Sequence, residues 1–153
     1  MPWTKLGSAS GSGDLEVSFD SGYNYLYVDC YIEDGNGLFF KFNDSTSSTD
    51  IDLRYEIENT TGTQQNRAGI WCYYDGNDVY KKCTMHVTNQ DGYDSMCILE
   101  ASTSTTTTAS SQAPKKCYTL GYWKNTNQIT KITGYAFSGT TSANSTMVVY
   151  GSE

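Results

Sequence analysis

Residues 25 to 33 read Tyr-Leu-Tyr-Val-Asp-Cys-Tyr-Ile-Glu, and this stretch decides the fold class. Leu26, Val28, Cys30 and Ile32 alternate with aromatic or charged residues, a period of two that is typical of a β-strand with one face in a core. Residues 33 to 37, Glu-Asp-Gly-Asn-Gly, favour a turn because glycine adopts positive φ at little cost. Residues 38 to 42 then predict the second strand of a hairpin.

Similar runs recur along the rest of the chain, separated by Gly, Asn and Asp. The further predicted strands are 15–19, 51–57, 69–74, 79–88, 96–101, 117–124, 129–137 and 146–150. Short strands at near-regular spacing with turn residues between them are typical of a sandwich. We therefore expect an all-β fold, a single antiparallel β-sandwich that is jelly-roll-like and has a short N-terminal arm.

The ends of the predicted sandwich follow from composition. Residues 1–14 predict an N-terminal arm and flexible connector, since residues 7 to 14 are almost entirely Gly, Ser and Ala. Residues 15–153 form the sandwich domain, within which the Ser/Thr-rich tract 102–113 predicts an exposed loop. An exposed Trp is costly, so Trp3 is expected to dock on its own sheet or on a neighbouring subunit.

Charge and hydropathy exclude several partners. The 153 residues carry a net charge of -7, whereas nucleic-acid binding requires clustered Lys and Arg. No run approaches the roughly 18 apolar residues of a membrane span. The first residues lack a signal peptide, so we expect synthesis in the cytoplasm if the sequence is the whole gene product.

The residues that usually carry catalysis are sparse. The single histidine, His86, lies on the polar face of a predicted strand with no nucleophile beside it in the sequence. Three carboxylate pairs are candidates for glycosidase chemistry: Glu33 with Asp34, Asp50 with Asp52, and Glu56 with Glu58. All three are better explained as turn or solvent-facing residues, and we predict that the chain is not an enzyme.

Cofactors, disulfides and glycans remain less constrained. The five cysteines form no zinc motif, and the phase of Cys30 and Cys83 favours buried thiols, with one or two disulfides as the alternative. No cofactor is expected, although a structural Ca²⁺ is possible at the acidic turns 34–36, 43–44, 75–78 and 91–94. Glycosylation sequons begin at Asn43, Asn59 and Asn144.

Aromatic side chains supply the candidate binding residues. Tyr and Trp are favoured at protein interfaces and also stack on sugars. The predicted interface residues are Trp3, Leu6, Tyr25, Tyr27, Tyr31, Tyr122 and Trp123.

Two further motifs carry a resemblance. Residues 121–132 read Gly-Tyr-Trp-Lys-Asn-Thr-Asn-Gln-Ile-Thr-Lys-Ile, and 145–151 read Ser-Thr-Met-Val-Val-Tyr-Gly. With Phe-Lys-Phe-Asn-Asp-Ser at 40–45, this resembles a pattern of small structural proteins of tailed bacteriophages and archaeal viruses. The resemblance implies a virion structural protein without catalytic residues, most simply a capsid decoration (cement) protein or otherwise a tail or fibre component. Its expected location is the virion, and its expected partners are further copies of itself as a homotrimer and the major capsid or tail proteins.

Two other functions stay open on the sequence alone. A secreted or receptor-binding carbohydrate-binding module would use the aromatic residues as a glycan platform. A small glycoside-active enzyme is the least favoured, because no acid–base pair converges in the sequence.

Overall fold

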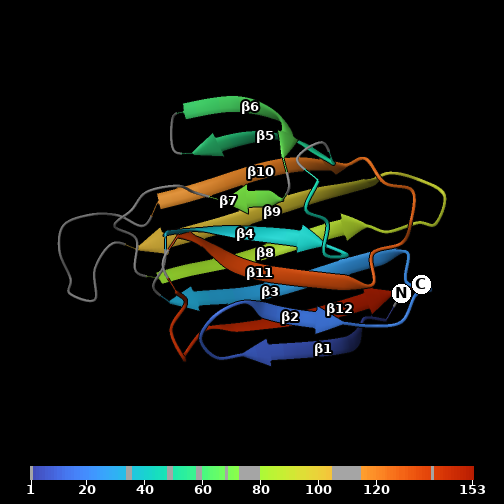
Figure 1. The fold of residues 1–153 in the computed structure, drawn as a ribbon, viewed down its shortest axis with the longest axis horizontal. Helices are drawn as coiled ribbons and strands as arrows, with labels where there is room; N and C mark the ends of the chain where they lie inside the picture. Colours follow the sequence, from blue (N-terminus) through green and yellow to red (C-terminus); the bar gives the residue numbers. More distant parts are fainter. Residues whose placement is uncertain are drawn as a thin grey trace.

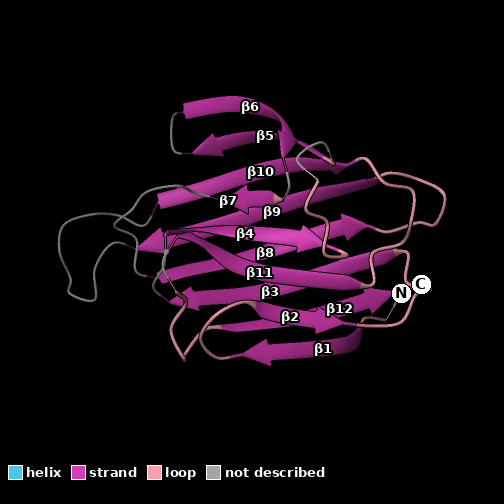
Figure 2. Ribbon diagram, in the orientation of Figure 1, coloured by secondary structure: helices cyan, strands magenta, loops and turns pink. Residues whose placement is uncertain are grey.

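The computed structural model describes residues 2–33, 36–47, 50–57, 60–67, 69–72, 80–104, 115–138 and 140–153. Within these ranges every regular element is a β-strand and no helix is present (Figure 2). Accordingly, none of the described residues belongs to a helix long and apolar enough to cross a membrane. Two antiparallel sheets pack face to face, which confirms the predicted all-β sandwich.

The larger sheet has eight strands, all paired antiparallel. Across the sheet they are β1 (Thr4–Ser10), β12 (Thr146–Ser152), β3 (Tyr25–Glu33), β8 (Tyr80–Thr88), β9 (Ser95–Ser104), β10 (Lys115–Trp123), β5 (Ile51–Ile57) and β6 (Thr60–Arg67). The pairing of β1 with β12 brings the first and last strands together, so both chain ends lie at the same end of the sandwich (Figure 1).

The smaller sheet has four strands and covers one face of the larger. Its strands, in order, are β2 (Leu15–Ser18), β11 (Lys131–Ser138), β4 (Asn36–Phe42) and β7 (Ile70–Cys72). β2 contacts β1 and β12, and β7 contacts β10, β5 and β9. The smaller sheet therefore extends across the larger one from β1 to β5 (Figure 1). Among the residues that the structure describes, no strand covers the opposite face of the larger sheet.

The core lies between the sheets and follows the period-two pattern. Leu26, Val28, Ile32 and Ile132, all predicted core residues, are each 0% exposed. Antiparallel sheets of this kind bury one face and solvate the other, so the alternating residues of each strand point outward. The core phase and the outward phase therefore follow directly from the sequence.

The predicted hairpin of residues 25–33 and 38–42 is wrong. β3 belongs to the larger sheet, where it pairs with β12 and β8, and β4 belongs to the smaller sheet, where it pairs with β11 and β7. A Gly-rich segment reverses the chain equally well within a sheet and between sheets; here Gly37 has a φ of 65°. Both strands still present alternating apolar residues to the same core, which is why periodicity alone did not separate the two arrangements.

The predicted flexible connector is also wrong in its first half. Residues 4 to 10 form edge strand β1, in which Leu6 and Ala9 pack against the core. Gly7 lies so close to β2 that a Cβ there would be 2.7 Å from Val17 Cγ1. Small residues have weak strand propensity, but they allow this close approach, and pairing with β12 supplies the backbone hydrogen bonds.

Two further differences concern the length of one strand and the existence of another. β9 continues to Ser104 and buries Thr103 (2% exposed), so the Ser/Thr tract begins inside a strand; residues 105 to 113 of the predicted loop lie outside the described residues. The polar edge strand β6 was not predicted, because Thr-Thr-Gly-Thr-Gln-Gln-Asn-Arg contains no apolar alternation.

Four of the five cysteines are buried thiols, among them Cys30 and Cys83, whose phase predicted it. Cys30, Cys83, Cys97 and Cys117 are each at most 1% exposed, and none is in a disulfide. Burial raises the pKa of Cys97 far above that of a solvated thiol, because the apolar core disfavours the thiolate. These thiols therefore act as small core residues.

Candidate binding surface

The outer face of the larger sheet, which none of the described strands covers, is the candidate binding surface. Strand register places one side chain from each of eight strands in a line across this face, which we call the central outer row. Its members are Lys5, Tyr150, Tyr27, His86, Ile98, Leu120, Arg54 and Thr63. The middle of the row is aromatic or aliphatic, whereas its ends are basic or polar.

A hollow of about 470 Å³ lies at one end of the central outer row. Trp3, Tyr27, Asp29, His86 and Tyr150 line it, and we call it the aromatic hollow. The Tyr27 ring is its centre: the ring centroids of His86, Trp3 and Tyr150 lie 4.9, 6.0 and 6.0 Å from that of Tyr27. Trp3 thus docks on its own sheet, one of the two expected positions, yet remains 47% exposed.

A second hollow of about 360 Å³ lies toward the other end of the row. Met96, Leu120 and Tyr122 expose 53%, 37% and 43% of their surfaces there, and we call it the Leu120 hollow. The Tyr122 hydroxyl donates to Asp94 Oδ2 at 2.8 Å, and this hydrogen bond to a carboxylate raises the pKa of Tyr122. Exposed apolar side chains gathered in this way usually mark an interaction site.

The structure divides the predicted interface residues into two groups. Trp3, Tyr25 and Tyr122 are exposed, and Tyr27 and Tyr31 are half-buried on the same outer face. Trp123 is a correction: it is 0% exposed, because its position in β10 points inward, where its ring packs edge-on against Phe42 at 5.6 Å.

Leu6 is the second correction among the predicted interface residues. It is half-buried and packs against the core, with its Cδ1 only 2.8 Å from where a Cβ on Gly151 would lie. A side chain in this position stabilises the β1–β12 edge and offers little surface to a partner.

Three of the six carboxylates considered for catalysis, Glu33, Asp50 and Asp52, make polar contacts within the fold, and Glu56 is exposed. Glu33 Oε2 accepts from Ser142 Oγ and Asn144 Nδ2, both at 2.7 Å, and so holds the 142–145 turn. Asp50 accepts a hydrogen bond from Ser45, and Asp52 pairs with Lys124 Nζ at 3.2 Å. Asp34 and Glu58 lie outside the described residues.

His86 is exposed on the outer face, as predicted, and its ring lies against that of Tyr27 at a tilt of 48°. Over the part of the chain that the structure describes, no three His, Cys, Asp or Glu side chains gather to hold a metal ion. Two of the predicted calcium turns, 34–36 and 75–78, lie mostly or wholly outside that part, so the calcium prediction is untested.

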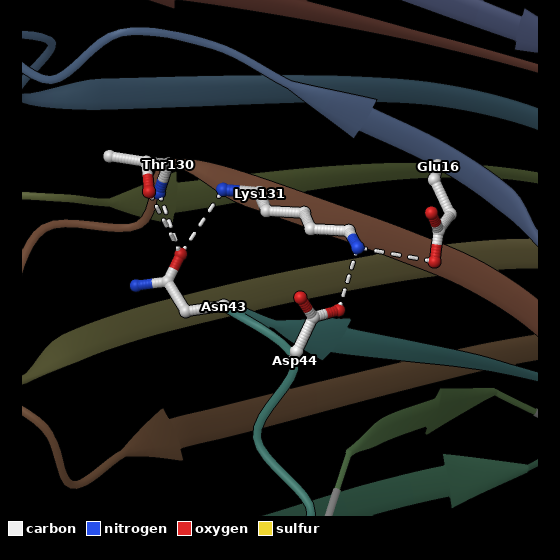
Figure 3. A network of polar contacts seen from close by, with 5 residues as sticks. All are labelled: Glu16, Asn43, Asp44, Thr130 and Lys131. Atoms are coloured by element: carbon white, nitrogen blue, oxygen red, sulfur yellow. Dashed lines mark hydrogen bonds and ion pairs between the residues drawn. The ribbon is translucent and has the colours of Figure 1, made fainter.

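Two of the three motifs that carry the viral resemblance, 40–45 and 121–132, meet at one end of the smaller sheet (Figure 3). Asn43 Oδ1 accepts from the backbone N–H groups of Thr130 (2.8 Å) and Lys131 (3.1 Å), and its Nδ2 donates to the carbonyl of Gln128 (2.9 Å). Lys131 Nζ lies 2.8 Å from Asp44 Oδ1 and 3.3 Å from Glu16 Oε1. The hydrogen bond to Asp44 raises the pKa of Lys131.

A second asparagine fixes the same connection from the other side. Asn89 is 1% exposed; its Nδ2 donates to the carbonyls of Tyr23 (2.9 Å) and Ile129 (3.1 Å). The two asparagines therefore clamp the β10–β11 connection. Of the other two sequon asparagines, Asn144 donates its Nδ2 to Glu33, and Asn59 lies outside the described residues.

Comparisons with known proteins add no relative. Neither the protein-family models nor the curated proteins contain a match to this chain. The viral resemblance therefore depends on the short motifs alone, and those motifs are occupied with holding the fold.

Sequence reasoning missed several residues of the outer face. Tyr150, Ile98, Leu120 and Met96 each occupy the outward phase of a predicted strand, which was a readable signal. Their neighbours across the sheet depend on strand order and register, which no single strand encodes.

Proposed function

We propose that this chain is a non-enzymatic virion structural protein, a capsid decoration (cement) protein displayed on a tailed virus particle, and that it binds through the outer face of its larger sheet. The observation that carries the proposal is the uncovered face of eight strands with its apolar central row. A rigid sheet face of this kind suits binding to other proteins, because little conformational entropy is lost on docking.

The Leu120 hollow is the proposed contact between protein copies. Met96, Leu120 and Tyr122 combine aliphatic, sulfur-containing and aromatic surface, a composition typical of interface cores. Asp52 and Arg54 at its border supply both charges of a polar rim. We propose a closed homotrimer, in which the acidic remainder of the surface keeps the displayed particles soluble.

The virion setting is supported by the resemblance of the 40–45, 121–132 and 145–151 motifs. A tail or fibre component would use the same surface and is distinguished only by its place on the particle. A carbohydrate-binding module is the second candidate, favoured by the aromatic hollow.

The first experiment measures the mass of the purified protein by light scattering, with and without EDTA. We expect a trimer that EDTA leaves intact, and a Leu120→Asp variant that is monomeric because a charge enters the contact. The matched control is Tyr93→Asp, at a side chain 64% exposed in the turn between β8 and β9, which should remain trimeric.

The second experiment uses antibodies to the purified protein for immunogold labelling of virus particles from the producing culture. Labelling of the capsid supports decoration, and labelling of the tail supports the tail or fibre alternative. A wild-type protein that is monomeric at all concentrations and labels no particles would refute the proposal.

A further inference from the structure

The aromatic hollow combines apolar rings with groups that can hydrogen-bond hydroxyls. Three aromatic side chains, an imidazole and the half-buried carboxylate of Asp29 line it, and Trp3, the largest of them, stays half open to solvent. We propose that this hollow binds carbohydrate, with a neutral, extended glycan lying across the Tyr27 ring. The proposal goes beyond a virion role and holds whether or not the chain is part of a particle.

Ring geometry supports stacking against a sugar. The rings of Trp3 and Tyr150 are inclined to that of Tyr27 by 58° and 39°, and that of His86 by 48°. Inclined rings form the walls and floor of a shallow trough instead of closing on one another. The apolar C–H face of a pyranose packs against such rings, while its hydroxyls remain at the rim.

The polar groups of the hollow suit hydroxyls. Asp29 is the carboxylate of the lining; it forms an ion pair with Lys82, and its side chain is 38% exposed, which leaves oxygen surface for a ligand. His86 offers ring nitrogens that donate or accept. The Asp29 carboxylate in the hollow and the net charge of -7 both disfavour anionic ligands, so we specify a neutral glycan.

Strand order argues against an extended peptide added as a further strand. The hollow spans β12, β3 and β8, which are interior strands of the sheet and have both neighbours in place. Recognition there must come from side chains, whereas strand addition needs an open edge. The aromatic hollow and the Leu120 hollow have no lining residue in common, so the two sites are separate.

Tryptophan fluorescence gives a selective assay. Of the three tryptophans, Trp71 and Trp123 are 7% and 0% exposed, so acrylamide quenches mainly Trp3. We would screen the full chain on an array of neutral glycans. An oligosaccharide that binds would then be titrated while acrylamide quenching of the Trp3 fluorescence is followed. Binding at the hollow shields Trp3, and the shielding should saturate with the same affinity as direct calorimetric binding.

Point variants test whether the glycan binds at the aromatic hollow. Tyr27→Ala and Trp3→Ala should each weaken binding by about tenfold or more, as truncation of a stacked anchor does. Asp29→Asn keeps the shape of the side chain and should also weaken binding. Tyr122→Ala is the matched control: an exposed tyrosine on the same face, in the Leu120 hollow, whose loss should leave glycan affinity unchanged.

Three results would overturn the proposal: no neutral glycan on the array bound, unaltered affinity in both Tyr27→Ala and Trp3→Ala, or affinity lost in Tyr122→Ala instead. Thermal unfolding of each variant shows that it is folded, and Trp3→Phe, which keeps a stacking ring, should restore most of the affinity. Concentration-dependent shielding of Trp3 without glycan would assign the hollow to a second copy of this chain and also refute the proposal.

Discussion

Replacement of Asn43 by alanine should destabilise the sandwich severely, although the residue is polar and lies at a chain turn. Asn43 and Asp44 have φ values of 49° and 55°, and Ser45 N donates to the Phe42 carbonyl at 2.9 Å to close the turn after β4. Asparagine tolerates this left-handed conformation better than alanine does. The same side chain makes the three hydrogen bonds that hold the β10–β11 connection.

The cost follows from these contacts. Alanine leaves two backbone N–H groups and one carbonyl without their partner, at about 1 kcal/mol each in this half-buried setting. The left-handed φ adds about 1 kcal/mol for alanine. The expected loss is therefore about 4 kcal/mol of unfolding free energy, a large share of the roughly 5–15 kcal/mol typical of a domain.

Urea denaturation followed by far-UV circular dichroism measures the loss. Asn43→Gly separates the two contributions, because glycine accepts the φ but makes none of the bonds; it should cost about 3 kcal/mol. The matched control is Asn125→Ala in the same connection, whose Oδ1 accepts one exposed local bond from Asn127 N at 3.0 Å. It should cost less than about 1 kcal/mol. An Asn43→Ala variant as stable as Asn125→Ala would refute the clamp.

Three further predictions concern the core, the thiols and alkaline pH. Trp123→Ala should lower the unfolding free energy by about 3–5 kcal/mol, because the indole is fully buried, whereas Tyr122→Ala should cost less than about 1 kcal/mol; equal losses in urea melts would contradict the inward phase of Trp123. In the native protein no more than one of the five cysteines should react with Ellman's reagent, because four are buried. Fast reaction of two or more thiols would contradict this. The pKa of Lys131 is raised above its ordinary value of 10.5, so the charged side chain stabilises the fold at every pH below that value. This stabilisation is lost as the pH rises through the pKa of the folded state. The unfolding free energy of the wild type should therefore fall more in that pH range than that of Lys131→Met.

The sequence predicted which residues are core far better than it predicted which strands are neighbours. The alternation in β3 identified Leu26, Val28 and Ile32 as buried, because the pleat forces successive side chains to opposite faces. The same alternation is silent on partners, and so the hairpin of β3 with β4 was wrong. Burial is a property of one strand, whereas pairing depends on chain segments far apart in sequence.

Errors at the sheet edges have a related cause. β1 and β6 are edge strands with few apolar residues, and backbone pairing holds them more than side-chain burial does. Propensity and periodicity both depend on side chains, so such strands look like loops in the sequence. Two residues of the aromatic hollow, Tyr27 and Trp3, were predicted from the sequence. That His86 and Tyr150 lie beside Tyr27 depends on the register of the strands, which the sequence does not show.

The positions that carry the viral resemblance and the positions available for binding are largely different residues. Asn43, Trp123 and Lys131 belong to the motifs, and each is engaged by the fold: one as a clamp, one in the core, one between two carboxylates. Side chains that hold the fold together do not identify what its outer face binds, because function depends on the binding site and not on the fold. The central outer row lies mainly outside them, and Leu120 directly precedes the 121–132 motif. Changes along that row, made while the motifs are left intact, are therefore the ones that separate a capsid partner from a glycan.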